Sequence, residues 1–378
     1  MNGTAHNFPS RPAWIEIDLG QLRRNLRLIR AALPPAVKLL AVVKDDAYGH
    51  GAVNVVRVAM EEGAWGCGVS TLEEAMTLRQ AEIKSPLLIF GERTEAELEW
   101  CVAHGLTVCV NGAPGVRALA QAAMRFGKRV PVHLKINTGM NRYGVSCEAA
   151  LPLVEQILSE KSLHLEGVMT HFAQSDELDK TYANQQVTRF DGVIAALNQK
   201  GVFIALKHLC NSGGFLDLPD AHRDMVRIGI LMHGIFPSQV CRRIEGIAPV
   251  MSVKVKIAAL QKLKPGECVG YGMRYTATGE RRIAVLPMGY GDGFPRVRNA
   301  GCALIHGRRA PLVGGVAMDA LMVDITEIPQ AQMWDEAVIM GRQGSEEITV
   351  RDLANLKNTV PYDVLTSWRL RLPKKNVG

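Results

Sequence analysis

The sequence predicts an α/β protein: an N-terminal (β/α)8 barrel of the TIM type, followed by a mainly β C-terminal domain. The first observation is that short apolar runs recur eight times in the first two-thirds of the 378-residue chain, with helix-like segments between them. The second is a change after about residue 237, where β-like segments alternate with glycine and proline turns. We place the barrel at residues 12–240 and the β domain at 241–378, with a linker at 234–249.

Each apolar run is typical of a strand that is buried on both faces of a parallel sheet. In order, the runs are LLAVV (39–43), GCGVS (66–70), PLLIF (86–90), LTVCV (106–110), VPVHLKI (130–136), LHLEGVMTH (163–171), IALKHLC (204–210) and MVRIGIL (225–231). A stretch with helical spacing precedes the first run, at Leu22, Leu26, Ile29 and Leu33, and another separates the fifth run from the sixth, at Ala149, Leu153, Gln156 and Ile157.

The C-terminal third contains five β-like segments: MSVKVKIAAL, RRIAVLPMG, CALIHG, ALMVDIT and EAVIMG. One late helix candidate, TVRDLANLKN, follows them. This pattern indicates a separate domain rather than a continuation of the barrel.

Composition narrows the function classes. The net charge is +7, but the Lys and Arg residues are scattered among acids, which favours anionic small molecules over nucleic acid as partners. No apolar run approaches the ~18 residues that cross a bilayer, so we expect a cytoplasmic protein without a membrane partner. The eight cysteines form no C-x-x-C pair, and we expect neither disulfides nor a zinc site.

Polar side chains close several of the apolar runs, at the strand ends where barrels place their chemistry. Each alone has an ordinary structural explanation, such as a solvated strand end or a core histidine. If the barrel forms, however, they meet at one end of it. These candidates are Lys44, Tyr48, Arg142, His171, Asn211, Ser212 and Arg227.

The chain lacks G-x-G-x-x-G and G-x-x-x-x-G-K-[ST] motifs, and its His, Cys and acidic residues lack metal-ligand spacing, so no metal site is expected. A lysine at a barrel mouth is suited to a Schiff base, because burial disfavours its charged form. The carbonyl partner of Lys44 can belong to a substrate, as in an aldolase, or to pyridoxal phosphate.

Nine segments carry a family resemblance: AVVKDDAYGHG, LKINTGMNRYG, MTHFAQSDE, HLCNSGG, MVRIGILMHG, VGYGMRYTA, MGYGDGFPR, VGGVAMDALMVDI and NTVPYDV. In this order, and over nearly the whole chain, they resemble the motifs of bacterial alanine racemases, fold type III pyridoxal-phosphate enzymes. The resemblance implies a homodimer with shared active sites, in which pyridoxal 5'-phosphate forms a Schiff base with Lys44. It implies the interconversion of L-alanine and D-alanine, for peptidoglycan synthesis or for D-alanine breakdown.

The resemblance also assigns roles to residues. Tyr48, Ser212, Gly229, Ile230 and Tyr362 would hold the phosphate, as hydroxyl and backbone N–H donors can. Arg227, steadied by His208, would face the pyridine nitrogen, His171 and Asn211 would seat the ring, and Arg142 would touch the cofactor's phenolate oxygen and the substrate. Tyr271 would be the second catalytic base, with Tyr290, Met318 and Asp319 shaping substrate access from the partner subunit.

Racemisation needs a proton removed from one face of the α-carbon and returned to the other, so Lys44 and Tyr271 are the minimum pair of bases. Arginine is a donor with a very high pKa, so Arg227 should leave the pyridine nitrogen unprotonated and weaken the electron sink. Three positions depart from the common family pattern: Asp45 adds an acid beside Lys44, Asn137 replaces an aspartate, and His233 replaces a tyrosine. In some relatives the lysine equivalent to Lys135 is carbamylated.

Two enzymatic alternatives stay open: a broader-specificity amino-acid racemase and a fold type III amino-acid decarboxylase. The intact GYG and AMD motifs favour the racemase. A pyridoxal-phosphate-binding regulatory protein, built from a lone barrel, is less favoured because it has no need of a second domain that carries Tyr271.

Overall fold

The computed structural model describes residues 11–378. They form two compact units, Leu22–Ala248 and a second unit that joins the residues up to Gln21 with Pro249–Gly378. Within the described residues, no helix is long and apolar enough to span a membrane.

The first unit contains an eight-stranded parallel sheet whose strand order is β8-β7-β6-β5-β4-β3-β2-β9. Backbone hydrogen bonds from Asp224 N to Lys207 O (3.1 Å) and from Arg227 N to Cys210 O (2.9 Å) link its two outer strands, so the ring nearly closes. All eight predicted apolar runs are strands, and the predicted barrel is confirmed. They are β2 (Lys38–Val42), β3 (Gly66–Val69), β4 (Leu87–Ile89), β5 (Thr107–Val110), β6 (Val130–Lys135), β7 (Leu163–Met169), β8 (Leu206–His208) and β9 (Met225–Ile228).

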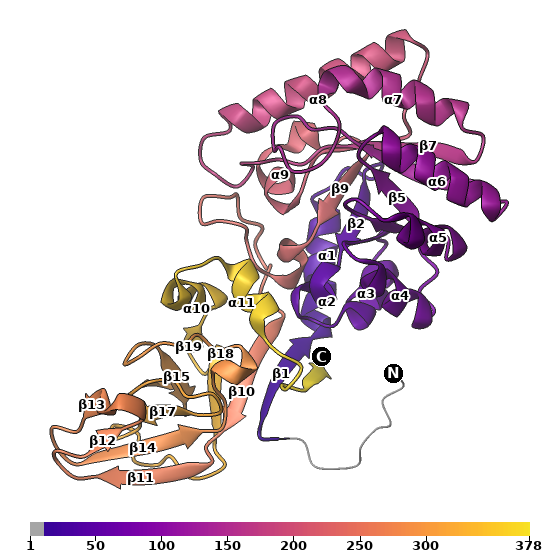
Figure 1. The fold of residues 1–378 in the computed structure, drawn as a ribbon. Helices are drawn as coiled ribbons and strands as arrows, with labels where there is room; N and C mark the ends of the chain where they lie inside the picture. The colour runs from indigo at the N-terminus through magenta and orange to yellow at the C-terminus, as the bar shows by residue number, and fades with distance from the viewer. Residues whose placement is uncertain (1–10) are drawn as a thin grey trace. The chain divides into compact units, whose positions relative to one another are not determined.

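Helices surround these strands (Figure 1). Thr71 and Thr94 begin α4 and α5 with reciprocal capping boxes, in which the threonine hydroxyl and a glutamate three residues later satisfy free backbone N–H groups. The helices are α1 (Leu19–Ala31), α2 (Lys44–Tyr48), α3 (Ala52–Glu61), α4 (Leu72–Gln80), α5 (Glu95–Ala103), α6 (Ala113–Arg125), α7 (Cys147–Ser159), α8 (Thr181–Gln199) and α9 (Ser212–Asp217), with short 3-10 turns η1 (Pro219–Ala221) and η2 (Ile230–His233).

The barrel interior is filled by side chains rather than open. Leu40, Leu88, Cys109, Met169, Leu206 and Met225 come from six different strands and form one buried cluster. The predicted helix residues Leu22, Leu26 and Ile29 are also buried. A packed interior leaves the loops at the carboxyl ends of the strands as the place for chemistry.

The second unit is mainly β, as predicted. Its largest sheet has the order β16-β15-β18-β10-β1-β20 with β19 paired to β18, and smaller sheets join β11-β14-β17 and β12-β13. The strands are β1 (Ala13–Asp18), β10 (Met251–Lys256), β11 (Ala259–Leu263), β12 (Cys268–Val269), β13 (Tyr275–Thr276), β14 (Arg281–Leu286), β15 (Cys302–Ile305), β16 (Arg308–Pro311), β17 (Leu321–Asp324), β18 (Glu336–Gln343), β19 (Glu346–Ile348) and β20 (Lys374–Val377). Its helical segments are η3 (Tyr271–Met273), η4 (Tyr290–Asp292), α10 (Val350–Lys357) and α11 (Pro361–Ser367).

The predicted N-terminal boundary of the barrel, residue 12, differs from the structure. Strand β1 pairs antiparallel with β10 and parallel with β20, so it belongs to the β unit (Figure 1). Its sequence, AWIEID, indicates a strand but carries no information on which sheet that strand joins. The unit that contains the barrel ends at Ala248, which lies inside the predicted linker at 234–249.

Candidate active site

Lys44 lies two residues after the end of β2 and opens a left-handed turn. The four residues after it, Asp45 to Tyr48, have φ values of 53°, 52°, 55° and 54°. Side chains other than glycine pay roughly 1–2 kcal/mol each for this conformation, because the Cβ atom crowds the following carbonyl oxygen. Four such residues in a row persist only where the surrounding structure holds them.

Three side chains hold the turn. His50, which is buried, donates from Nδ1 to the carbonyl oxygens of Ala47 (3.0 Å) and Tyr48 (2.9 Å), so this nitrogen carries the proton. The Asp46 carboxylate accepts from Ala52 N at 2.7 Å. The Glu74 carboxylate accepts from Asp45 N, also at 2.7 Å. Together they fix the backbone that carries Lys44 and Tyr48.

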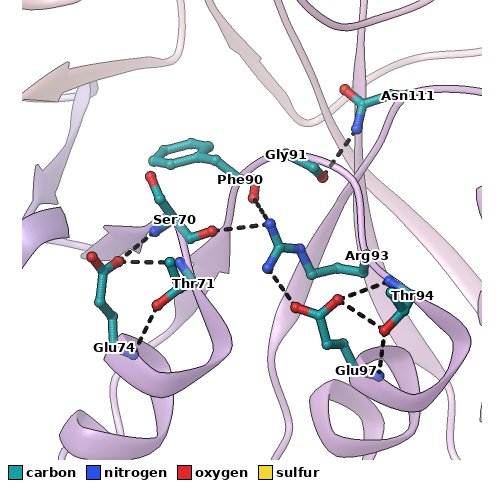
Figure 2. Close-up of polar contacts among 9 residues, drawn as sticks. All are labelled: Ser70, Thr71, Glu74, Phe90, Gly91, Arg93, Thr94, Glu97 and Asn111. Atoms are coloured by element: carbon teal, nitrogen blue, oxygen red, sulfur yellow. Dashed lines mark hydrogen bonds and ion pairs between the residues drawn. The ribbon is translucent and has the colours of Figure 1, made fainter.

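Glu74 reaches this turn from the start of α4. Its second carboxylate oxygen accepts from Ser70 N (2.7 Å) and Thr71 N (3.2 Å), as Figure 2 shows, so one side chain ties the Lys44 turn to the loop after β3. The backbone N–H of Asp45, the extra acid in the sequence, therefore contacts a second carboxylate, that of Glu74. Sequence reasoning missed both His50 and Glu74. The T-x-x-E spacing at 71–74 was a signal for the cap, but not for the contact with Asp45.

Arg93 ties the next loops together. Its Nη2 donates to the carbonyl oxygens of Ser70 (3.0 Å) and Phe90 (3.3 Å), and its Nη1 donates to Glu97 at 2.8 Å (Figure 2). The loops after β3 and β4 and the start of α5 thus form one hydrogen-bonded rim, which Glu74 connects to Lys44.

Two lysines at carboxyl ends of the barrel strands, Lys44 and Lys135, have lowered pKa values. Burial lowers the pKa of Lys44, and Arg142 lowers it further, while Glu74 and Asp45 oppose the shift. Burial also lowers the pKa of Lys135 to about 8. A lysine with a lowered pKa has more neutral amine at neutral pH, which is the form that attacks a carbonyl or accepts a proton.

Arg227 lies buried on β9, and both of its Nη atoms donate to acceptors from the neighbouring strands and loops. Its Nη1 donates to Nδ1 and to the carbonyl oxygen of His208, both at 3.0 Å. Its Nη2 donates to the Thr170 and Leu209 carbonyl oxygens at 2.8 Å and to His171 Nδ1 at 3.0 Å. Burial lowers its pKa to about 10, so it stays charged at neutral pH. Burial also holds the His171 pKa well below its usual value, with Arg227 adding to the shift.

Ser212, Gly229 and Tyr48 form a cradle of hydroxyl and backbone N–H groups. Ser212 Oγ accepts from Gly229 N at 3.3 Å and from Leu231 N at 3.4 Å, which leaves the Ser212 O–H as a donor. A Cβ atom at Gly229 would overlap the Tyr48 hydroxyl, so only glycine fits there. Convergent donors of this kind suit an oxyanion such as a phosphate. Ile230, the next predicted residue, opens η2 within the same segment.

Asn211 and Asn137 organise the loops that carry neighbouring candidates. Asn211 caps α9, because its Oδ1 accepts from Gly214 N (2.9 Å) and from Ser175 Oγ (2.8 Å). Asn137 Oδ1 accepts from Gly139 N (3.1 Å) and Asn141 N (3.0 Å), and so shapes the loop that leads to the exposed Arg142. Asn137, the departure from the family's aspartate, needs no charge to perform this role.

The remaining predicted residues belong to the second unit. Tyr271 begins η3 and is 82% exposed, and Met318 is also exposed. Asp319 pairs with Arg371, Tyr290 lies beneath the Arg296 guanidinium, and Tyr362 lies in α11. The structure thus brings Lys44, Tyr48, His171, Asn211, Ser212, Arg227, Gly229 and Ile230 to strand ends of one barrel, and places Tyr271, Tyr290, Met318, Asp319 and Tyr362 on the other unit.

Two family models cover the chain: "Alanine racemase, N-terminal domain" matches residues 17–237, and "Alanine racemase, C-terminal domain" matches residues 250–376. The chain belongs to the alanine racemase family. The family predicted from the nine motifs is confirmed.

Full-length relatives agree with this membership. An alanine racemase of Halothermothrix orenii is 36% identical over 97% of both chains, and one of Desulfosudis oleivorans is 38% identical over 96% of both. The solved alanine racemase of Clostridium difficile 630 is similar with a TM-score of 0.92 and 33% identity, covering 97% of this chain and 96% of that one. The biosynthetic alanine racemase of Pseudomonas aeruginosa has a TM-score of 0.85 and 31% identity, covering 97% of this chain and all 100% of its own.

Proposed function

We propose that this protein is an alanine racemase, which interconverts L-alanine and D-alanine with bound pyridoxal 5'-phosphate. The observation that carries the proposal is the group at the carboxyl ends of the barrel strands: a lysine with a lowered pKa, a buried arginine and an anion cradle, on a chain of this family.

The residues of the barrel suit the cofactor. Lys44 would carry it, and the hydroxyls of Ser212 and Tyr48 with the N–H groups at Gly229 and Ile230 would bind its phosphate. When bound, the cofactor withdraws electrons from the amino acid's α-carbon and so acidifies the α-proton. The assignments of Tyr362 to the phosphate, of Arg142 to the phenolate oxygen and substrate, and of Tyr290, Met318 and Asp319 to substrate access are supported by the family resemblance.

Arg227 and His171 set the electrostatics beside the ring. Arg227 would present an N–H to the pyridine nitrogen, and because arginine does not give up its proton, that nitrogen would remain unprotonated. His171 accepts from Arg227 at Nδ1, so a neutral His171 holds its own proton at Nε2. Its partly exposed ring can then donate from Nε2 to a group in the site.

Lys44 and Tyr271 would be the two bases. We assign the proton of D-alanine to Lys44 and the proton of L-alanine to Tyr271, which a partner subunit would supply in a homodimer. The large side chains of Tyr271, Met273 and Met318 are 82%, 71% and 52% exposed, as residues of a protein interface are before association.

Reconstitution with pyridoxal 5'-phosphate tests the proposal. The protein should turn yellow, borohydride should bleach and trap the adduct, and peptide mapping should find it on Lys44, with no adduct in Lys44→Ala. L-alanine should then racemise. Release of CO₂ from a panel of amino acids would instead indicate a decarboxylase, and equal rates with alanine, serine and larger amino acids would indicate a broad racemase. A colourless reconstituted protein would contradict the cofactor assignment.

Hybrid dimers test the shared site. Lys44→Ala and Tyr271→Phe should each be nearly inactive, and a mixture should recover activity because one of the two sites in each hybrid is intact. If activity stays absent after mass spectrometry has verified subunit exchange, the two bases do not come from different subunits.

A further inference from the structure

We propose that Glu166, on β7, is a positioning residue for Arg227 and acts on it through two buried histidines. The inference rests on the proposed function only in that Arg227 would face the cofactor. The contacts themselves form one continuous chain. Glu166 Oε2 lies 3.0 Å from His133 Nε2, His133 Nδ1 lies 2.8 Å from His208 Nε2, and His208 Nδ1 lies 3.0 Å from Arg227 Nη1.

The four residues come from four different strands. His133 is on β6, His208 on β8 and Arg227 on β9. Both histidines are completely buried, whereas the Glu166 side chain is 25% exposed. The chain therefore runs from a solvent-accessible carboxylate, through the interior of the barrel, to the arginine at the candidate active site.

The chemistry of the two ends permits one proton arrangement. Arg227 is only a donor, so His208 Nδ1 must accept and the neutral His208 carries its proton at Nε2. That N–H donates to His133, so His133 Nδ1 accepts and its proton is at Nε2. The His133 Nε2–H then donates to the Glu166 carboxylate, which is only an acceptor. Arg227, as a donor, and Glu166, as an acceptor, thereby specify the tautomers of both histidines from the two ends of the chain.

A second proton on either histidine would break a link. A proton at His208 Nδ1 would face the Arg227 N–H, and one at His133 Nδ1 would face the His208 N–H. Burial lowers the pKa of both rings, which agrees with neutral forms, and hydrogen bonding to His133 lowers the pKa of Glu166, which agrees with a carboxylate.

The barrel wall leaves space for this ring. A Cβ atom at Gly167, next to Glu166, would lie only 2.8–2.9 Å from three atoms of the His133 ring. Trp65 and His208 flank the same ring, with centroid distances of 6.5 Å and 4.9 Å. The position of His133 is thus fixed by packing on several sides, and a side chain at residue 167 would displace it.

Without an acceptor at residue 166, the buried His133 Nε2–H loses its partner, and only Arg227, at the other end of the chain, still favours this arrangement. If that proton moved to His133 Nδ1, His208 would have to accept at Nε2 and carry its own proton at Nδ1. The His208 Nδ1–H would then face the Arg227 N–H. Arg227 Nη1 would then lose one of its two acceptors, His208 Nδ1, and keep only the His208 carbonyl oxygen. We expect kcat to fall roughly tenfold, the scale of one hydrogen bond to a charged group, with KM for alanine nearly unchanged.

The test combines ¹⁵N NMR of histidine-labelled holoenzyme with kinetics. In the wild type, both His133 and His208 should show a protonated Nε2 and an unprotonated Nδ1. Glu166→Gln keeps an amide oxygen that accepts from His133, so it should retain both tautomers and most of kcat. Glu166→Leu removes the acceptor and should change both. Glu155→Leu, at an exposed position on α7, is the matched control and should change neither.

A proton at His133 Nδ1 in the wild type would overturn the proposal, and this measurement requires no variant to fold. Unchanged tautomers and kcat in folded Glu166→Leu would also overturn it. Gly167→Ala, which displaces the His133 ring without removing a polar group, gives a second perturbation and should lower kcat as Glu166→Leu does. If alanine does not racemise at all, the proposed function fails, but the tautomers can still be measured.

Discussion

Replacing His233 with phenylalanine removes a ring whose nitrogens are buried without partners. The side chain is 0% exposed, and within residues 11–378 neither ring nitrogen has a hydrogen-bond partner. The ring stacks on His50, with 3.9 Å between centroids, and lies edge-on to Tyr48 at 5.7 Å. The family resemblance places a tyrosine at this position, so we expect the site to accept a six-membered ring.

Two effects set the size of the change. A buried donor without a partner costs about 1–3 kcal/mol, so the variant should be more stable by about that amount at pH 7.5. Burial, followed by the neighbouring His50, also holds the His233 pKa well below its usual value. The pKa of this histidine in the unfolded chain is near 6.5, so below that pH the unfolded chain binds more protons at residue 233 than the folded protein does. The free energy of unfolding is therefore unaffected by this residue's titration above pH 6.5 and decreases as the pH falls below it.

The wild type should therefore lose about 1.4 kcal/mol more per pH unit than His233→Phe as the pH falls below 6.5. Urea unfolding, followed by tryptophan fluorescence at pH 7.5, 6.5 and 5.5, measures both effects. His104→Phe replaces an exposed histidine and is the control, which should follow the wild type. Parallel pH dependence of the wild type and His233→Phe would refute the reasoning.

Two further substitutions test the geometry around Lys44 and the anion cradle. Because Glu74 raises the pKa of Lys44, Glu74→Gln should move the acid limb of the kcat/KM profile to lower pH. Glu73→Gln, on the exposed side of α4, is the control and should leave the limb in place. An unmoved limb in Glu74→Gln would show that Glu74 does not set the pKa of Lys44. Gly229→Ala should weaken cofactor binding about 10- to 100-fold through overlap with the Tyr48 hydroxyl, as fluorescence titration would show. Gly192→Ala is the control, because a Cβ atom there meets no described atom within 4 Å, and equal affinities of the two variants would contradict the cradle.

The sequence predicts the barrel well because its strands are buried on both faces and appear as unbroken apolar runs. It does not predict that β1 joins the other unit, since an alternating strand such as AWIEID pairs by tertiary contacts that local sequence does not contain. Lys44, His171 and Asn211 could be predicted as candidates because each closes or follows an apolar run, and Arg227 because it is the one charged residue within its run, MVRIGIL.

The residues that hold those groups were beyond sequence reasoning. A left-handed turn over Asp45 to Tyr48 contains no glycine that would signal it, so the roles of His50 and Glu74 at its backbone could not be anticipated. Glu166 and His133 are 33 residues apart and meet only because β6 and β7 are neighbours in the barrel. Their contact depends on the register of two parallel strands.

The exchange of the α-proton with deuterated solvent tests the two-base account most directly. Tyr271→Phe deletes one hydroxyl and should slow proton removal from L-alanine by a factor of ~10²–10⁴, the usual cost of losing a general base. Racemisation must slow equally in both directions, because an enzyme cannot change the overall equilibrium, but exchange can become asymmetric. The account predicts that the variant still exchanges the α-proton of D-alanine through Lys44 while exchange from L-alanine nearly stops. Unchanged exchange of both enantiomers would show that Tyr271 is not the second base.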